Sequence, residues 1–418
     1  MGKLLSDHQI AYNAAAVVTL HQLLTLTQAA APNAMPEIRV NQLARQLRTF
    51  QRCDTAWSTP VTQEGGTAMC QHCDRGFPNL HGVRFDRRSL LKTAAAGVVT
   101  IGLPFAGPAH AAPDTTFKGT HGTGFCNSAF FITHMLQLAK NDGVTLQFVN
   151  TPTNADAVTF FATGQVDVSV LPYTSFLALH GAGAPVKIVG GGGIQGCTVI
   201  AQPGLDTPAK LKGKTLGTFQ LDTLEVLPYD WLKMHGLSFN DITVRYLGST
   251  PEQVEAFKAG AIDIAGVIEP YATALLNDVK GSVLLSNGLD IYGPQYTDCV
   301  LAARTELIEK NPDGVTALIK AMLHGQYLFE NEREKMLSEL VGPYYKLSLE
   351  NARIGATKQP PKVDQRAQTE FILTRVQSVI EMGYLKKPPS KDAIDWRLLE
   401  AAIKESPDVY SKLKYKSA

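Results

Sequence analysis

The sequence has little net charge. Its 39 Lys and Arg residues almost balance 38 Asp and Glu residues, which leaves a formal net charge of +1 at pH 7. Nucleic-acid-binding domains usually carry a clustered basic excess, so this balance gives no indication of a nucleic-acid partner. Hydrophobic residues make up 44% and charged residues 18% of the chain. This composition is that of an ordinary globular protein, with enough chain for roughly one large domain or two to three smaller ones.

Familiar catalytic motifs are absent from the sequence. The glycine-rich stretch VGGGGIQGC at residues 189–197 lacks the Gly-Lys-Ser/Thr ending of a phosphate-binding loop, and no G-x-S-x-G nucleophile elbow occurs. Residues 112–418 contain no Cys-rich run, and His121, His134 and His180 are too scattered to indicate a metal site. The sequence therefore predicts a protein that is not an enzyme and that uses no cofactor or metal.

Long hydrophobic runs are also missing. The stretch TAAAGVVTIGLPFAG is shorter than the about 20 residues of a membrane-spanning helix, and it follows DRRSLLK at Asp86–Lys92. Paired arginines, a modest apolar stretch and the small residues of AHAAPD resemble a twin-arginine export signal. We expect cleavage after Ala111 and a periplasmic protein; a buried amphipathic helix that holds Arg87 and Arg88 is the alternative.

The signal region lies far from the first residue, although export signals are amino-terminal. Met69 would give it a conventional short polar lead. We expect residues 1–68 to be a non-native or disordered extension and residues 69–111 to form the signal region. A genuine cytoplasmic extension is the alternative.

The pattern Cys70-x-x-Cys73, with His72 and His81, offers two thiolates and two imidazoles. Its order and spacing match no strong zinc motif, and a segment removed with the signal has no need of a metal. We therefore expect no metal there.

Cysteine is scarce after the signal. Cys126 lies in a predicted loop, whereas Cys197 and Cys299 lie in the strand-like stretches GCTVIAQ and DCVLAAR. A cross-strand disulfide would form only if these strands were neighbours, and connectivity does not follow from sequence. Two reduced core cysteines are the favoured state, because twin-arginine substrates commonly fold before export.

The chain after the signal alternates β-rich and helical stretches, which is typical of an α/β protein. A first series ends near GCTVIAQ, and a second series with the same plan begins near Asp206. From QYTDCVLAART onward the pattern is mostly helical. We expect a first lobe over residues 112–203, a second lobe over 204–292, and a return strand with C-terminal helices of the first lobe over 293–418. The charged segment after Leu399 is expected to pack weakly.

One helix-strand unit occurs twice, at Thr153–Val168 and at Thr250–Ile264. In each copy a capped helix ends in Gly, a β-branched residue and Asp follow, and the strand ends in Pro-Tyr. Helix-ending glycines and Val/Ile in strands are common to all such units. The shared Asp and Pro-Tyr go beyond that background and indicate two lobes of similar design.

Four blocks in this order resemble the periplasmic solute-binding proteins of the aliphatic-sulfonate, nitrate and taurine importers, a family that also includes thiamine-precursor binding proteins. The blocks are FFATGQVDVSVLPY followed by HGAGAPVKIVGG, LDTPAKLKGKTLGTF, AFKAGAIDIAGVIEPYATAL and EMGYLKKPPS. The resemblance covers about residues 117–399. One departure is LQLAKNDGVTLQFVN, where the spacing is kept but the aromatic residue common in the family is lost.

The resemblance implies a type II periplasmic binding protein fold, with two lobes of mostly parallel sheets flanked by helices, hinge strands between the lobes and a helical C-terminal region. It implies a monomer that captures a small molecule between the lobes and delivers it to an ABC permease and ATPase complex. Contact with the membrane would occur only through the permease. A ligand-sensing receptor subunit is an alternative, and a pyrimidine-synthase-like enzyme is the least favoured one.

Ligands of open α/β sheets lie beyond the carboxyl ends of strands, where helix N-termini converge. Loops at these positions supply the candidate ligand-binding residues Phe125, Cys126, Asn127, Thr151, Asn154, Pro172, Tyr173, Thr174, Gly192, Gly193, Gln195, Gln220, Asp222, Thr223, Glu269 and Tyr271. The alternative roles are core packing for the tyrosines and helix capping for Asp222 and Thr223.

The predicted cleft contains two acids, Asp222 and Glu269, and no Lys or Arg. Such a site disfavours a strongly anionic ligand unless backbone amides dominate, and it suits a neutral or amine-bearing molecule. A small sulfonate or related nutrient follows from the resemblance. A pyrimidine precursor or another amino- or ring-bearing compound fits the acids equally well.

Overall fold

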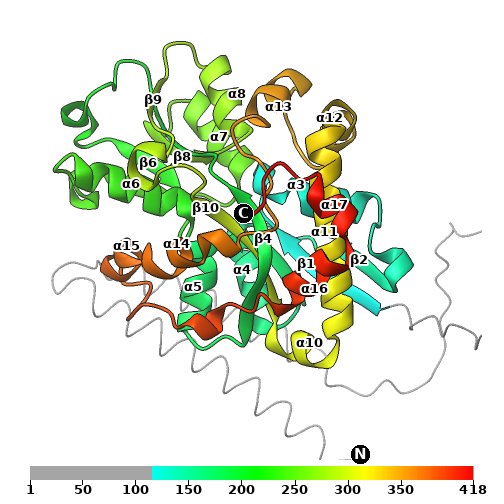
Figure 1. The fold of residues 1–418 in the computed structure, drawn as a ribbon. Coiled ribbons are helices and arrows are strands. Elements are labelled where there is room, and N and C mark those ends of the chain that lie inside the picture. The colour runs from blue at the N-terminus through cyan, green and yellow to red at the C-terminus, as the bar shows by residue number, and fades with distance from the viewer. Residues whose placement is uncertain (1–114, 418) are drawn as a thin grey trace, which may run out of the picture. The chain divides into compact units, whose positions relative to one another are not determined.

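The structure, a computed structural model, describes residues 115–417. The predicted extension, the signal region with Arg87 and Arg88, the cleavage position and the Cys70/Cys73 pair lie outside the described residues and stay predictions. Two five-stranded sheets, each flanked by helices, make up the described chain (Figure 1). This confirms the predicted α/β fold with two lobes.

The first sheet has the strand order β2-β1-β3-β10-β4, and the second has the order β7-β6-β8-β5-β9. The strands of the first sheet are β1 (Thr115–His121), β2 (Val144–Phe148), β3 (Val168–Pro172), β4 (Val186–Ile194) and β10 (Thr297–Arg304). Those of the second are β5 (Cys197–Ala201), β6 (Thr215–Thr218), β7 (Thr243–Tyr246), β8 (Ile264–Ile268) and β9 (Val283–Ser286). The two sheets thus follow one plan, as the sequence repeat predicted.

The sheets are mixed, which corrects the prediction of mostly parallel strands. In the first sheet β1 pairs in parallel with β2 and β3, whereas β10 runs antiparallel to β3 and β4. In the second sheet β6 is parallel to β7 and β8, whereas β5 is antiparallel to β8 and β9. The antiparallel strands include β5 and β10, which follow the two crossings between the sheets. An antiparallel strand needs no crossover helix within its own sheet.

The chain passes from the first sheet to the second at Gln195 and Gly196, between β4 and β5. It returns through α9 (Leu289–Tyr292) into β10. Strands of the second sheet therefore begin before residue 204, where the second lobe was predicted to start. Gln195 and Gly196 both have a positive φ, 61° and 84°, a conformation that glycine adopts without steric cost.

Helices flank both sheets, and the chain after β10 is helical as predicted. The longer helices are α3 (Ser128–Met135), α4 (Asn154–Thr163), α5 (Tyr173–Gly181), α6 (Thr223–Met234), α7 (Thr250–Lys258), α8 (Tyr271–Asp278), α10 (Thr305–Lys310), α11 (Pro312–Asn331), α12 (Arg333–Leu340), α13 (Leu349–Gly355), α14 (Thr369–Thr374), α15 (Gln377–Glu381), α16 (Arg397–Glu405) and α17 (Pro407–Ser411). Short 3-10 turns are η2 (Phe125–Asn127), η3 (Lys140–Asp142), η4 (Pro208–Leu211), η5 (Phe239–Asp241), η6 (Arg366–Gln368) and η7 (Lys391–Ala393). Within residues 115–417 no helix is both long and apolar enough to cross a membrane.

The two repeated helices start with different caps. Thr153 caps α4 through a capping box, in which its Oγ1 accepts a hydrogen bond from the Asp156 amide at 3.1 Å. Ser249 caps α7, and its Oγ accepts from the Glu252 amide at 3.4 Å. Thr250 is therefore the first residue of α7 rather than its cap, which leaves its hydroxyl free for another contact.

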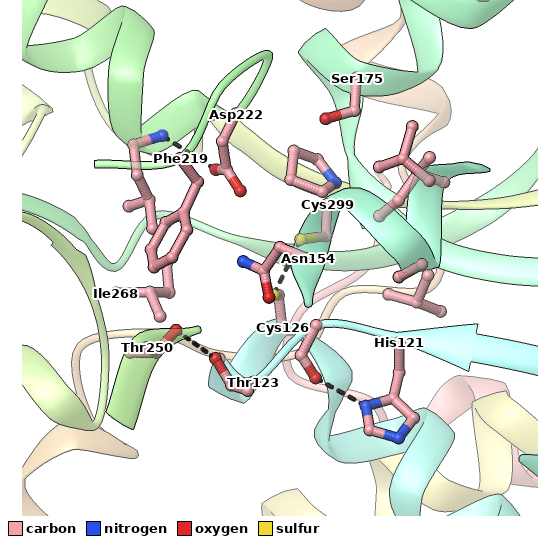
Figure 2. Close-up of a pocket in the computed structure, with 18 of the residues that line it drawn as sticks. His121, Thr123, Cys126, Asn154, Ser175, Phe219, Asp222, Thr250, Ile268 and Cys299 are labelled. Carbon is pink, nitrogen blue, oxygen red and sulfur yellow. Dashed lines mark hydrogen bonds between the residues drawn. The ribbon is translucent and has the colours of Figure 1, made fainter. Parts of the chain in front are cut away.

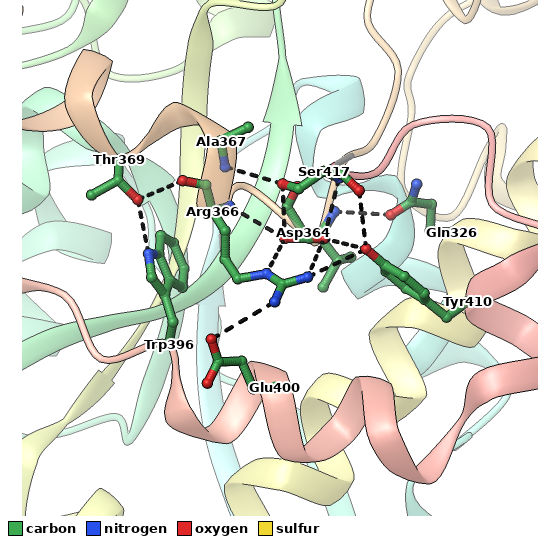
Figure 3. Close-up of polar contacts among 10 residues, drawn as sticks. Gln326, Asp364, Arg366, Ala367, Thr369, Trp396, Glu400, Tyr410 and Ser417 are labelled. Carbon is green, nitrogen blue, oxygen red and sulfur yellow. Dashed lines mark hydrogen bonds and ion pairs between the residues drawn. The ribbon is translucent and has the colours of Figure 1, made fainter.

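The C-terminal segment is firmly anchored, so the expectation of weak packing after Leu399 is wrong. Asp364 is fully buried; it accepts hydrogen bonds from Arg366 Nε at 3.0 Å and from the Tyr410 hydroxyl, and the Ser417 amide donates to it at 3.2 Å (Figure 3). Burial opposes ionisation of Asp364, but the hydrogen bonds from Arg366 and Tyr410 outweigh it and lower its pKa to about 2. The partners lie far apart in sequence, so composition alone did not reveal the contact.

Gly266 in β8 allows the first turn of α6 to approach the second sheet. A Cβ at this position would lie 2.0 Å from the Leu224 carbonyl oxygen, which is a backbone atom. Asp222 caps this same turn, so the position of Asp222 depends on where α6 packs.

We expect Gly266→Ala to lower the free energy of unfolding by about 1–3 kcal/mol, because α6 must move to admit the methyl group. Urea denaturation measures the change. Gly119→Ala in β1 is the matched control, because the atom nearest to its added Cβ is Phe130 Cζ, a side-chain atom at 3.1 Å. A loss in Gly119→Ala as large as that in Gly266→Ala would contradict the explanation.

Candidate ligand-binding pocket

A pocket lies between the two sheets at the carboxyl ends of their parallel strands. His121 and Pro172 end β1 and β3, Tyr246 and Ile268 end β7 and β8, and Phe219 follows β6 directly; all five line the pocket. The cavity measures about 160 Å³. A cavity of roughly 150 Å³ is large enough for benzene, so this one suits a small molecule. Figure 2 shows the labelled side chains around the space.

Two contacts join the sheets beside the pocket. The Thr123 and Thr250 hydroxyls are 2.6 Å apart, with one in the loop after β1 and the other at the start of α7. The Asn154 amide donates to the Gly248 carbonyl at 3.0 Å. Each contact links a loop of one lobe to the first residue of a helix in the other lobe. The structure therefore shows the two lobes in contact around the cavity.

A third contact between the sheets involves Leu221. Thr174 Oγ1 and Ser175 Oγ at the start of α5 both donate to the Leu221 carbonyl, at 3.0 and 2.6 Å. Leu221 has a positive φ of 65°, which is uncommon for a residue with a side chain. The loop between β6 and α6 is thus held against the first lobe, and this loop carries Gln220 and Asp222 into the pocket wall.

The ionisable groups of the pocket favour their uncharged forms. Burial raises the pKa of Asp222 to about 8, even though the Leu224 amide donates to its Oδ1 at 3.0 Å and stabilises the carboxylate. Burial also raises the pKa of Asp298 and lowers that of His121. Among the described residues that line the pocket none is Lys or Arg. Burial therefore acts against charge on all three groups of the pocket walls.

The structure brings part of the predicted site together. The predicted residues that line the pocket are Cys126, Asn127, Asn154, Pro172, Gln220 and Asp222. The predicted residues outside its lining are Phe125, Thr151, Tyr173, Thr174, Gly192, Gly193, Gln195, Thr223, Glu269 and Tyr271. Several of the residues outside the lining lie next to residues that line the pocket and help to hold them in position.

Glu269 is the clearest case of a predicted ligand contact with another structural role. Its side chain is 1% exposed; Oε1 lies 3.3 Å from Lys358 Nζ and Oε2 accepts from the Thr273 amide at 3.1 Å. Glu269 therefore forms an ion pair and stabilises the first turn of α8. Its partner Lys358 comes from a distant part of the chain, so the strand ending gave no sign of the pair.

The two predicted tyrosines pack in the interior, which was their alternative role. Tyr173 is 1% exposed and donates to the Arg375 carbonyl at 3.1 Å. Tyr271 is 3% exposed, and its hydroxyl accepts from the Lys346 amide at 3.3 Å. Each ring thus connects the end of its strand to the C-terminal helical region.

Sequence reasoning missed several lining residues, among them His121, Thr123, Ser175, Phe219, Tyr246, Thr250, Asp298 and Cys299. The first six lie at strand ends, in the loop after a strand or in the first turn of a helix, so a complete use of the strand-end rule would have included them. Asp298 and Cys299 lie inside β10, near its beginning. No strand-end rule selects them.

Cys197 and Cys299 are free and buried, which agrees with the favoured expectation of two reduced core cysteines. Cys197 and Cys299 lie in different sheets, so the condition for a cross-strand disulfide between them is not met. Cys126 Sγ is instead 2.9 Å from Cys299 Sγ, and Cys197 Sγ is 3.2 Å from Asp298 Oδ1. All three are buried free cysteines.

Comparison with known proteins supports this architecture. Residues 140–334 match the protein-family model described as NMT1/THI5 like. A protein of Brucella abortus (strain 2308) that is named only as a binding protein is 30% identical over 121 residues. That match covers 29% of this chain and 38% of the relative, so it spans well under two thirds of the relative's length.

Solved structures of ligand-binding proteins have the same fold. The ligand-binding component of an ABC-type import system from Staphylococcus aureus, solved with zinc bound, has a TM-score of 0.60 at 18% identity, covering 69% of this chain and 98% of that one. The alkanesulfonate-binding protein of Xanthomonas axonopodis pv. citri bound to MOPS has a TM-score of 0.57 at 20% identity, covering 68% and 99%. The periplasmic nitrate-binding protein of Synechocystis has a TM-score of 0.61 at 15% identity, covering 72% and 91%. Residues 140–334 are therefore similar to the NMT1/THI5-like family, and the described chain has the fold of periplasmic ligand-binding proteins.

Proposed function

We propose that this protein is the periplasmic substrate-binding component of an ABC importer, which captures a small organic molecule between its two lobes. The observation that carries the proposal is the cavity enclosed by the carboxyl ends of parallel strands from both sheets, with contacts such as Thr123 to Thr250 across it. In proteins whose two lobes close on a hinge, the ligand is held in a cavity of this kind between the lobes. The likeness to ligand-binding components of import systems supports it.

The partners in this proposal are an ABC permease and its ATPase, and the protein acts as a monomer without catalysis of its own. Export by the twin-arginine route would place it in the periplasm, as the DRRSLLK stretch predicts. A sensing subunit on the same fold is the second role. An adjacent gene for a membrane sensor kinase, in place of permease and ATPase genes, would favour sensing.

The polarity of the pocket indicates the ligand class. Asp222 and Asp298 resist ionisation, and the lining in the described chain offers no Lys or Arg to an anion. A protonated carboxyl donates a hydrogen bond to a neutral ligand, and an ionised one pairs with an amine. Phe219 and Tyr246 add aromatic surface. We therefore propose a neutral or amine-bearing ring compound, such as a pyrimidine, ahead of a sulfonate or nitrate.

Thermal unfolding of the full chain with a panel of pyrimidines, amines, aromatic acids, sulfonates and nitrate tests this function. A ligand that binds only the folded state adds about 2.7 kcal/mol at a hundredfold excess over its Kd. We expect a pyrimidine or amine to raise the Tm and Phe219→Ala to reduce that rise. Thr163→Ala, at an exposed position near the end of α4, is the control and should keep it.

Two results would count against the proposal. A Tm rise with sulfonates or nitrate alone would contradict the neutral or amine-bearing class. A rise that survives Phe219→Ala undiminished would place the ligand outside this pocket.

The raised pKa of Asp222 predicts a pH-dependent stability. The folded state holds this proton up to about pH 8, whereas an unfolded Asp loses it near pH 3.9, so the free energy of unfolding falls as pH rises between these values. Asp222→Asn removes this titration and still caps α6. When the pH rises from about 5 to about 8, the free energy of unfolding of Asp222→Asn should fall less than that of the wild type, by on the order of 1–3 kcal/mol.

Urea denaturation at the two pH values measures this difference. Asp298 titrates in the same direction, so part of the pH dependence remains in the variant. Asp206→Asn is the control, because Asp206 is exposed and pairs with Lys210 at the surface at 2.7 Å. Identical pH dependence in the wild type and Asp222→Asn would contradict a raised pKa at Asp222.

A further inference from the structure

Three side chains at the floor of the pocket place metal-binding atoms close together. Cys126 Sγ, Cys299 Sγ and an Asp298 carboxylate oxygen all lie within 4.8 Å of one another. Cys299 Sγ is 3.2 Å from Asp298 Oδ2, and the three residues are at most 4% exposed. All three line the cavity that holds the proposed ligand.

An irregularity in β10 explains how two consecutive residues reach one site. Successive side chains of a regular strand point to opposite faces. The pairing of β10 with β4 shifts register on both sides of Cys299, between Thr297 and Cys299 and between Cys299 and Val300. Such bulges redirect side chains and are common next to functional sites. Here the irregularity coincides with the point at which Asp298 and Cys299 meet Cys126.

The approach of Cys126 depends on a glycine in β4. A Cβ on Gly193 would lie 2.6 Å from the Cys126 Cα, so only glycine lets the η2 turn come this close to the sheet. Gly193 was among the predicted ligand-binding residues. In the structure the group that approaches is Cys126.

Polar groups surround the three side chains as an outer layer. Gln359 Nε2 donates to Asp298 Oδ2 at 2.9 Å, and Asn127 Nδ2 donates to Cys126 Sγ at 3.3 Å. Cys197 Sγ contacts the other carboxylate oxygen, Asp298 Oδ1. Outer hydrogen bonds of this kind orient metal ligands and strengthen their binding.

The Asp298 carboxyl has no cationic partner among the contacts of the described chain. Its hydrogen-bond donors are thiols, the Thr223 hydroxyl and the Gln359 amide, and no Lys, Arg or His side chain in the described chain forms an ion pair with it. Buried carboxylates are normally paired with a cation, coordinated to a metal, or protonated. A disulfide between Cys126 and Cys299 would use the two sulfurs but leave the carboxyl without a counter-ion.

We propose that Cys126, Cys299 and Asp298 bind one divalent metal ion of the zinc class, with the fourth coordination position open to the pocket. Two thiolates, one carboxylate and an open position form a donor set that zinc accepts. Binding releases the two thiol protons, and the carboxyl proton where present, to solvent. Tetrahedral Zn–S bonds of about 2.3 Å hold two sulfurs about 3.8 Å apart, so the thiols must separate from 2.9 Å.

Cobalt(II) is the probe, because its thiolate complexes absorb light through sulfur-to-metal charge transfer. The experiment uses the reduced full chain with Cys53, Cys70 and Cys73 changed to Ser, which leaves Cys126, Cys197 and Cys299. We expect one cobalt per chain, charge-transfer absorption, and displacement of the cobalt by zinc.

Variants of the three ligands test the assignment. Cys126→Ser, Cys299→Ser and Asp298→Asn should each weaken cobalt binding at least 100-fold, because loss of an outer hydrogen bond alone costs about 10–100-fold. Asp206→Asn is the control; Asp206 is an exposed acid that pairs with Lys210 at the surface, outside the pocket, and the variant should bind cobalt within about 10-fold of the parent.

Any of three results would overturn the proposal. The first is the absence of charge-transfer absorption in the reduced parent chain, which decides the question even if a cysteine variant does not fold. The second is unchanged binding in Asp298→Asn. The third combines two observations on one protein: its reduced form takes up no metal, and a small-molecule disulfide oxidant joins Cys126 and Cys299. None of these results depends on the ligand that the Tm panel identifies.

Discussion

The chain crossing at Gln195 and Gly196 is the constraint on which the pocket depends. The Gln195 amide donates to the Tyr296 carbonyl at 2.9 Å, so the outgoing chain before β5 and the returning chain before β10 lie side by side. Gln359 also contacts this crossing, because its Nε2 donates to the Gln195 carbonyl at 3.0 Å. Two short crossings held by hydrogen bonds keep the carboxyl ends of both sets of parallel strands facing each other. The cavity between the sheets follows from that geometry.

The parts of the fold that depend on local chemistry could be predicted from the sequence. The capped helix that starts after Thr153 and ends before Gly164 follows from its own residues. The mixed direction of the strands did not follow, because it depends on which sheet β5 and β10 join. The site divides in the same way. Asn154 and Asp222 were predicted because they start helices at strand ends.

The residues that were missed or given another role depend on long-range contacts. The sequence predicted Glu269 as an acid of the pocket, because its ion pair with Lys358 is visible only in the structure. Asp298 and Cys299 lie within a strand, where a regular pleat would separate their side chains, and only the shifted register brings both to the cavity floor. Positions of this kind cannot be recognised from spacing alone.

The polarity of the pocket does not favour the kind of ligand that two of its structural neighbours are named for. Those neighbours include proteins that bind an alkanesulfonate and nitrate, both anions. Here burial raises the pKa of Asp222 and Asp298 and lowers that of His121, and a helix cap rather than a basic side chain faces the space. A shared fold therefore fixes where a ligand lies, whereas the side chains decide its charge.

The central claim is that a small molecule binds between the two sheets. Hydrogen–deuterium exchange with the ligand that raises the Tm most tests it directly. The account predicts slower amide exchange in two separate segments, Gly122–Cys126 of the first lobe and Phe219–Asp222 of the second. Slower exchange confined to one lobe, or no change in either segment while the Tm rises, would contradict the claim.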